Sequence, residues 1–329
     1  MRPPLLSELP HPGSEKVGWP WHVPAPIVHH TVPEGSRLPR ISVVVATLNQ
    51  GAYIETMLRS VLLQGYPDLE LIVFDGGSTD QSVDILGRYD AWISHWRSEP
   101  DGGQSAAINK GLALATGELV SIFDSDDYFP PDCLGAVGAF YAGHRDCLIA
   151  GDVIRKWEGR EDVMQVAVRD SDLRDYVKWW EIDHVAGPGV FYPRTVIERA
   201  GQIDETLHYL WDYEFTMRCL EHVPLVALGV VTAVMFHTKG SKSASSANNG
   251  FWELAQIVKR YYATFPELTR ESRRQIAGLL LASGLKRIVR GHPHGFASVS
   301  ESLRTAPWAA LTWVFPGWPI RRLRRLTGP

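Results

Sequence analysis

Short apolar runs alternate with amphipathic segments along the middle of the chain. From residue 41 to residue 46 the side chains are β-branched or small, a pattern typical of a strand covered on both faces. Beyond this run, Ile54, Leu58, Val61 and Leu62 recur at the spacing of one helical face, which predicts an amphipathic helix. The organised part of the chain therefore begins with a strand followed by a helix.

The same alternation continues as far as residue 123. We predict further strands at residues 69–74, 91–96 and 118–123, and helices between them at residues 83–89 and 104–115. Ser78-Thr79-Asp80-Gln81 matches a capping box, in which a hydroxyl and a later carboxamide satisfy the first backbone amides of a helix. Strands alternating with helices of about ten residues predict an α/β fold with a mostly parallel sheet flanked by helices.

Polar residues and glycines follow each of the four predicted strands. Because parallel strands end at the same edge of a sheet, and ligands bind in the crevice beyond that edge, these segments indicate a common site. The segments are residues 47–49 (Thr-Leu-Asn), 75–78 (Asp-Gly-Gly-Ser), 98–103 (Ser-Glu-Pro-Asp-Gly-Gly) and 124–127 (Asp-Ser-Asp-Asp). Polar residues at four consecutive strand ends, with carboxylates at three of them and glycines at two, are typical of binding rather than of packing.

The pair Asp124 and Asp126 directly follows the fourth predicted strand. In an extended backbone, side chains two residues apart lie on the same side, so both carboxylates would face one cation. Carboxylates, phosphate and water are the ligands that Mg²⁺ and Mn²⁺ prefer. An isolated Asp-x-Asp is more often a solvated acidic turn, but its place after a buried strand favours a site for Mg²⁺ or Mn²⁺.

No glycine-rich phosphate loop accompanies this acidic pair. The sequence contains neither GxGxxG after its first predicted strand nor GxxxxGK[ST], which excludes the dinucleotide-binding and P-loop classes. A phosphate bound at this edge would therefore be neutralised chiefly by a metal ion and by side chains.

Two residues in the second half are further candidates for chemistry. Asp212 stands at the start of a predicted helix, where it would either stabilise the helix terminus or act as a general base. His237 follows an apolar run at 225–236, where it would be a surface histidine or a third metal ligand. The spacing alone favours the surface histidine.

Composition narrows the class of protein and its compartment. With 329 residues, 45% of them hydrophobic and 21% charged, the chain suits one large α/β domain or two domains, and it is neither disordered nor a coiled coil. Three widely spaced cysteines without a CxxC pair exclude a disulfide framework and a cysteine zinc site. The first residues lack the apolar run of a signal peptide, so we expect a cytoplasmic protein.

Charge is unevenly distributed along the chain. Residues 270–329 carry eleven Lys and Arg against two Glu, although the whole chain has a net charge of −4. Three tryptophans and an arginine-rich run at 321–325 give this end the composition of an interfacial anchor. The apolar stretch 306–320 is too short and too rich in proline to span a bilayer. We expect peripheral contact with the inner face of a membrane and, without a recognised nucleic-acid module, no nucleic-acid partner.

Two long segments resemble family 2 glycosyltransferases with the GT-A fold. They read ISVVVATLNQGAYIETMLRSVLLQGYPDLELIVFDGGSTDQSVDIL and SEPDGGQSAAINKGLALATGELVSIFDSDDYFPPD, within residues 41–132. Weaker similarity continues at 187–192, which is similar to the glycine-rich loop of the family, and at 210–214, which is similar to its acceptor-side acidic motif. The combination is far more specific than any single motif.

The resemblance implies a domain organisation. A Rossmann-like GT-A domain is expected over residues 41–250, with a nucleotide-sugar half at 41–132 and an acceptor half at 133–250. An extended N-terminal arm at 1–40 and a helical, basic C-terminal extension at 251–329 would flank this domain.

The resemblance also implies a role for individual residues. Seven positions match the family's site for the nucleotide-sugar donor: Thr47, Leu48, Asn49, Asp75, Gln104, Lys110 and Asp124. Asp126 and His237 match metal ligands for Mg²⁺ or Mn²⁺, and Asp212 matches the catalytic base. Leu48 and Gly76 stand where many relatives carry an aromatic residue and a second aspartate, so the sequence predicts no particular nucleotide base.

The function implied is that of an inverting glycosyltransferase. It would move a sugar from a nucleotide-diphospho-sugar to a hydroxyl of a glycan or lipid-linked acceptor, in polysaccharide or glycolipid assembly. Residues 178–184 and 241–249 are candidates for acceptor contacts, the second also for a lid over the donor. One alternative is a sugar nucleotidyltransferase, although TLNQGA lacks the glycine-rich, basic loop which that class needs. Another is a degenerate transferase that binds a nucleotide sugar without turnover.

Overall fold

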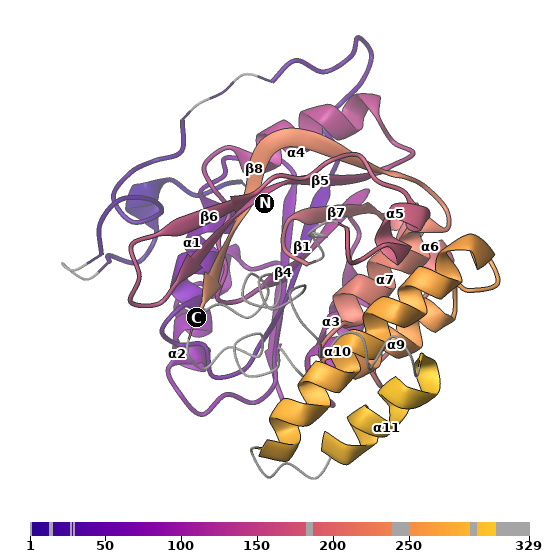
Figure 1. Cartoon of the computed structure of the whole chain (residues 1–329). Helices are drawn as coiled ribbons and strands as arrows, with labels where there is room; N and C mark the ends of the chain where they lie inside the picture. Colours follow the sequence, from indigo (N-terminus) through magenta and orange to yellow (C-terminus); the bar gives the residue numbers. More distant parts are fainter. Residues whose placement is uncertain are drawn as a thin grey trace. The chain divides into compact units, whose positions relative to one another are not determined.

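The chain forms two compact units. A computed structural model describes residues 2–12, 16–26, 28, 30–181, 187–238, 250–289 and 295–306 (Figure 1). The sheet unit comprises Met1–Asp172, His184–Thr206 and Trp211–Phe236, and the helical unit comprises Leu173–Asp183, Leu207–Leu210 and His237–Pro329. Four predicted features lie outside the described residues: the candidate lid at 241–249, the end of the acceptor segment at 182–184, the C-terminal tryptophans and the arginine-rich run.

The described residues form a sheet of eight strands. Its order is β3 (His95–Ser98), β2 (Leu69–Asp75), β1 (Ile41–Thr47), β4 (Leu119–Asp124), β7 (Val190–Pro193), β5 (Leu148–Trp157) and β6 (Val163–Val166), and β8 (Leu225–His237) pairs with β5. The first four strands along the chain run parallel, as predicted. The pairs β4–β7, β7–β5 and β5–β6 are antiparallel. The predicted α/β fold is confirmed.

Helices flank the sheet, and helices make up most of the described part of the helical unit. The sheet unit contains α1 (Ile54–Leu62), α2 (Ser82–Arg88), α3 (Gln104–Leu114), α4 (Cys133–Gly143), α6 (Arg194–Ala200) and α7 (Trp211–Leu220). The helical unit contains α5 (Leu173–Val177), α9 (Gly250–Lys259), α10 (Thr269–Val289) and α11 (Gly295–Thr305). The predicted helical C-terminal region is therefore present.

Two local predictions were wrong. The third strand lies at His95–Ser98 rather than at 91–96, because residues Asp90–Trp92 form a 3₁₀ turn and β3 is a short, largely exposed edge strand without an apolar signal. The capping box at Ser78 does not form, because α2 begins only at Ser82. The Ser82 amide donates instead to the Asp80 carboxylate at 2.9 Å. The Ser78 hydroxyl accepts from the Asn49 amide, in the loop after β1.

The N-terminal arm packs on the sheet unit through its tryptophans. The arm contains one described turn of 3₁₀ helix, at Leu6–Glu8. The Trp19 indole Nε1 donates to the Phe129 carbonyl at 2.8 Å, and the Trp21 side chain is buried. The arm is therefore part of the folded unit.

Arg59 of α1 is fully buried and fastens this arm. Its guanidinium donates to the carbonyl oxygens of Pro10 at 2.9 Å and Pro20 at 3.1 Å. It also donates to the Trp21 carbonyl at 3.3 Å and to the Tyr89 hydroxyl at 3.2 Å, and it lies 5.1 Å from the centre of the Trp21 ring. A buried cation is tolerated where its donors are satisfied, and here the arm supplies most of the acceptors.

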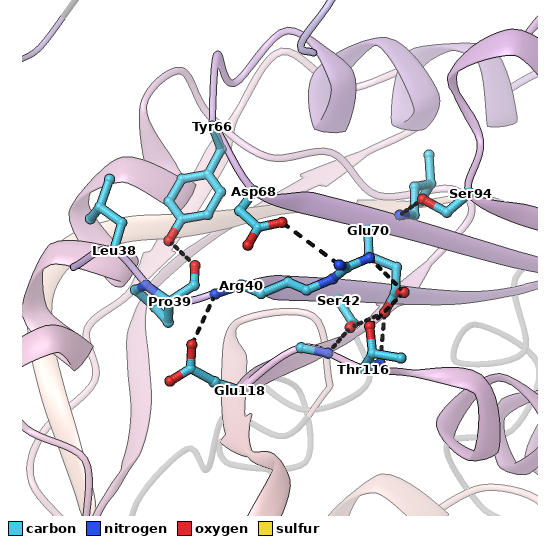
Figure 2. A network of polar contacts seen from close by, with 12 residues as sticks. Leu38, Pro39, Arg40, Ser42, Tyr66, Asp68, Glu70, Ser94, Thr116 and Glu118 are labelled. Carbon is cyan, nitrogen blue, oxygen red and sulfur yellow. Dashed lines mark hydrogen bonds and ion pairs between the residues drawn. The ribbon is translucent and has the colours of Figure 1, made fainter. Parts of the chain in front are cut away.

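A second buried charge, Glu70, holds the strands together at the amino end of the sheet (Figure 2). Its carboxylate accepts from the Ser42 hydroxyl of β1 and from the backbone amide and hydroxyl of Thr116, which precedes β4. Arg40 donates to it at 3.0 Å. Burial alone would raise the pKa of Glu70, but the hydrogen bonds from Ser42 and Thr116 and the charge of Arg40 lower it overall.

Glu70→Gln is expected to destabilise the fold by about 1–3 kcal/mol at pH 7, since an amide cannot accept all of these hydrogen bonds. Because the folded-state pKa lies below the unfolded value, the carboxylate contributes stability above the unfolded pKa and loses it as the pH falls through the folded pKa. Urea denaturation of both proteins from pH 7 to pH 3 should therefore show a difference that shrinks with acidification. A constant difference would contradict this role of the charge.

Candidate functional site

The strand register brings the four polar strand ends to one edge of the sheet. Thr47 is paired with Asp75, and Asp75 with Ser98, so the last residues of β1, β2 and β3 lie side by side. Asp124, the last residue of β4, is paired with Ala46 on the other side of β1. The shared edge predicted from the sequence is confirmed.

Asp75 organises the loop that follows β2. Its side chain is 1% exposed and accepts hydrogen bonds from the Gly77 amide at 3.1 Å and the Ser78 amide at 2.8 Å. The hydroxyls of Ser78 and Ser98 donate to the same carboxylate. These four bonds fix the loop between β2 and α2, so Asp75 acts on the site through the loop that it shapes.

The loop after β1 is tied to the same β2–α2 loop. Asn49 has a φ of +53°, a left-handed conformation that asparagine adopts more readily than most residues. Its amide donates to the Ser78 hydroxyl at 2.6 Å, and its carboxamide oxygen accepts from the Thr79 amide at 2.9 Å. Leu48, which directly precedes Asn49, is 54% exposed. A large apolar side chain is thereby held in solvent at the edge of the site.

Thr47 supplies a polar atom without a described partner. The residue is buried, and its hydroxyl forms no hydrogen bond within the described part of the chain. Buried hydroxyls are nearly always paired, with protein, water or ligand. Thr47 is thus suited to accept or donate a hydrogen bond at this edge.

Asp101, in the loop after β3, was not assigned from the sequence. A Cβ placed on Gly76 would lie 3.2 and 3.3 Å from the two Asp101 carboxylate oxygens. The same carboxylate accepts from the Gly103 amide at 2.8 Å. The Asp101 carboxylate therefore lies against the position from which a side chain at residue 76 would start. In the sequence, the only indication of a role for Asp101 was its place in a polar loop after a strand.

Gln104 and Lys110, both on α3, have different surroundings. The Gln104 carboxamide donates to the Asp124 carboxylate at 2.9 Å, so it joins the acidic end of β4. The Lys110 ammonium pairs with Glu99 at 2.9 Å, and Arg97 pairs with the same carboxylate at 2.8 Å. The structure brings Gln104 and Asp124 together, whereas the described partner of Lys110 is Glu99.

The acidic segment after β4 turns instead of continuing as an extended strand, which corrects the prediction. The Asp127 amide donates to the Asp124 carbonyl at 3.3 Å, closing a turn through Asp126. Burial still alternates along the turn: Asp124 and Asp126 are half-buried, whereas Ser125 and Asp127 are buried. Asp127 accepts from the Phe236 amide at 2.9 Å and so joins the turn to β8.

Like charge is concentrated in this turn. Burial raises the pKa of Asp126. Burial, together with the charges of Asp124 and Asp126, raises the pKa of Asp127 well above its ordinary value. No ion pair to Asp126 or Asp127 occurs in the described part of the chain. A cation bound to this turn would relieve the repulsion.

The donor set fits Mg²⁺ or Mn²⁺ rather than a cation that needs a complete protein cage. Over the described ranges, no group of three or more His, Cys, Asp or Glu side chains has the arrangement of a metal site. Mg²⁺ usually takes one or two carboxylates and completes its shell with waters and substrate phosphates. His237 is the last residue of β8 and belongs to the helical unit, so its predicted role as a ligand stays a prediction.

Asp212 lies in the first turn of α7, half-buried, and beside the glycine-rich segment. A Cβ on Gly187 would lie 3.4 Å from its Oδ2, and Gly187 has a φ of +92°. The other carboxylate oxygen accepts from the Tyr213 amide at 2.8 Å. Further along the same helix, buried Glu214 pairs with Arg218 at 2.9 Å. The glycine thus leaves room beside a carboxylate that is held in place.

Known proteins match this chain in sequence and in fold. The family model described as glycosyl transferase family 2 matches residues 42–201. The PGL/p-HBAD biosynthesis glycosyltransferases of Mycobacterium bovis and Mycobacterium tuberculosis are 30% identical over 200 residues, which cover 57% of this chain and 72% of theirs. The chain belongs to glycosyl transferase family 2.

This family 2 glycosyltransferase is also similar in fold to a solved structure. TarS 1–349 of S. aureus in complex with UDP-GlcNAc has a TM-score of 0.57 and 19% identity, covering 84% of this chain and 91% of that one. The fold is therefore GT-A, as the resemblance implied.

The family 2 match covers the strand-end residues but not every candidate. It includes the loops from Thr47 to Asp127 and ends before Asp212 and His237. No described helix of this glycosyltransferase is both long and apolar enough to cross a bilayer.

Proposed function

We propose that the chain transfers a sugar, with inversion, from a nucleotide-diphospho-sugar to a hydroxyl of a glycan or lipid-linked acceptor. The observation that carries this proposal is the convergence of four strand-end loops on one edge, with a repulsive acidic turn among them. The relatives support it, because TarS was solved with UDP-GlcNAc and the mycobacterial relatives are named for PGL/p-HBAD biosynthesis.

The nucleotide would lie over the loops after β1, β2 and β3. Leu48 offers an exposed apolar surface for the face of a base, and the Thr47 hydroxyl, which has no partner among the described residues, offers a hydrogen bond. Asp101 lies over Gly76, where it can accept hydrogen bonds from the N–H groups of a base or from a ribose hydroxyl. Asp75 and Asn49 would hold these loops in the shape that the nucleotide requires.

The diphosphate and the sugar would lie beside the acidic turn and α3. Asp126, with Asp124 behind it, would hold Mg²⁺ or Mn²⁺, and Gln104 orients Asp124. A bound divalent ion would supply the positive charge that neutralises the departing diphosphate. Lys110 lies on the same helix, and its ammonium would reach the diphosphate only by giving up or sharing its ion pair with Glu99.

Asp212 would act as the general base. Its carboxylate takes the proton from the acceptor hydroxyl as that oxygen attacks the anomeric carbon, while the bond from that carbon to the diphosphate breaks. Because Gly187 has no side chain, nothing of that residue beyond its backbone would stand between the acceptor hydroxyl and this carboxylate. A single displacement inverts the anomeric centre and requires no covalent sugar intermediate.

The test is a thermal-unfolding panel of nucleoside diphosphates and their sugars, with and without Mn²⁺. Because the pKa of Asp126 is raised, its ionised form costs stability, and this cost grows as the pH rises through the folded pKa. We expect Mn²⁺ alone to raise the midpoint at pH 7, and one nucleotide class to raise it further. Asp126→Asn should raise the metal-free midpoint by about 2–4 °C and abolish the response to Mn²⁺.

Asp84→Asn is the matched control, since Asp84 is exposed on α2, and it should leave both midpoints unchanged. A stabilised Asp126→Asn protein that still responds to Mn²⁺ would contradict the assignment of the metal to this turn. Stabilisation by a nucleotide sugar without any transfer or hydrolysis would contradict the enzyme and favour a nucleotide-sugar-binding protein.

A further inference from the structure

The last two described helices form a tightly packed antiparallel pair in the helical unit (Figure 1). A Cβ on Gly284 of α10 would lie 2.7 Å from Val299 of α11, and one on Gly295 of α11 would lie 2.7 Å from Ile288. Further along, the Ser302 hydroxyl donates to the Ala277 carbonyl at 2.6 Å. These contacts run in opposite directions along the two helices and define the face that each presents to the other.

Four large apolar side chains lie one position beyond these contact residues. On α10 they are Leu285 and Val289, and on α11 they are Phe296 and Leu303. One residue further along a helix is a rotation of about 100°. Because the helices are antiparallel, equal rotations turn both sets toward the same side of the pair. We call these four residues the hairpin face.

The hairpin face is exposed. The exposed fractions are 43% for Leu285, 87% for Val289, 71% for Phe296 and 42% for Leu303. Single exposed apolar residues are ordinary on a protein surface, whereas four gathered on one side of a helix pair indicate an interaction site. Val289 and Phe296, the two most exposed, adjoin the connection between the helices.

The segment that carries this face has a surplus of positive charge in its sequence. Residues 269–305 contain seven Lys and Arg and two Glu, in a chain whose net charge is −4. Arg304 directly follows Leu303, and its side chain is 77% exposed. Exposed apolar side chains, one of them aromatic, beside a surplus of positive charge are the combination that binds an anionic bilayer surface.

We propose that the hairpin face docks on an anionic lipid surface, with Val289 and Phe296 inserted among the lipid headgroups. Helices α10 and α11 lie along the surface, and Arg304 contacts lipid phosphates. A protein partner would equally bury the apolar residues, but the charge surplus favours lipid. This contact is separate from the proposed chemistry, because none of its residues belongs to the strand-end site.

The experiment is flotation of the full-length protein with vesicles of phosphatidylcholine, alone or with about 30% phosphatidylglycerol. We expect binding to the anionic vesicles and a loss of at least about tenfold in the double variant Val289→Ser/Phe296→Ser. The matched control is Val163→Ser/Val230→Ser, which removes exposed apolar side chains of β6 and β8 and should bind normally. Thermal unfolding and hydrolysis of the nucleotide sugar should be unchanged in both variants.

Binding of the double variant that equals binding of the wild-type chain would overturn the proposal and assign any lipid affinity to other segments. Equal binding to neutral and anionic vesicles would overturn the electrostatic part. A concentration-dependent dimer that Val289→Ser/Phe296→Ser abolishes, without vesicle binding by the wild-type chain, would identify a second copy as the occupant. A wild-type chain that binds anionic vesicles but does not hydrolyse any nucleotide sugar would count against the proposed function and not against the lipid contact.

Discussion

Asp212→Asn is expected to lower the rate of sugar transfer by about 10²–10⁴-fold, because the amide cannot take a proton from the acceptor hydroxyl. The substitution preserves the shape of the side chain and an oxygen that can accept from the Tyr213 amide. The donor should therefore stabilise the variant against heat as much as it stabilises the wild-type protein. The measurement is single-turnover transfer of labelled sugar from the donor that the thermal panel selects into a lipid extract.

Asp204→Asn provides the comparison for this variant. Asp204 accepts from the amide and hydroxyl of Thr206 at 3.0 and 2.6 Å, outside the strand-end site. We expect its transfer rate to stay near that of the wild-type protein. An Asp212→Asn protein that retains its rate within about threefold would exclude Asp212 as the base.

Arg59→Leu is expected to lower the free energy of unfolding by about 3–5 kcal/mol, the range found when one partner of a buried charged network is removed. Leucine fills part of the space but leaves the carbonyl oxygens of Pro10, Pro20 and Trp21 buried without donors. Urea denaturation followed by tryptophan fluorescence measures the change and reports directly on the arm.

Two further variants separate geometry from charge. Arg59→Lys keeps the charge but lacks the planar fork that reaches several acceptors, so we expect an intermediate loss. Arg88→Ala removes an exposed arginine that pairs with Glu55 at 3.4 Å, and should cost less than about 1 kcal/mol. Equal losses for Arg59→Leu and Arg88→Ala would show that the arm is not fastened by Arg59.

The strands that carry the site could be predicted because burial on both faces leaves a strong signal. β1, β2 and β4 are mainly apolar, and parallel pairing then places their ends together without further information. β3 was misplaced because an exposed edge strand has no such run. Arg59 was missed because an arginine on an amphipathic helix is ordinarily taken as solvent-facing.

Within the site, residue types were predictable and their partners were not. The sequence indicated that Asp75 and Asp124 lie at one edge, which depends only on strand order. It did not show that Asp75 is saturated by its own loop, or that Asp101 reaches over Gly76, because both depend on how separate loops fold against each other. The turn at Asp126 likewise follows from a backbone bond that no side-chain pattern encodes.

The arm held by Arg59 also bears on how the chain folds as it is made. Pro10, Pro20 and Trp21 leave the ribosome before Arg59, so the acceptors of this buried cation are already present when α1 emerges. Tyr89, its remaining described partner, follows 30 residues later. A circular permutant that begins at β1 would reverse this order and leave Arg59 without its three carbonyl acceptors until the last residues were synthesised.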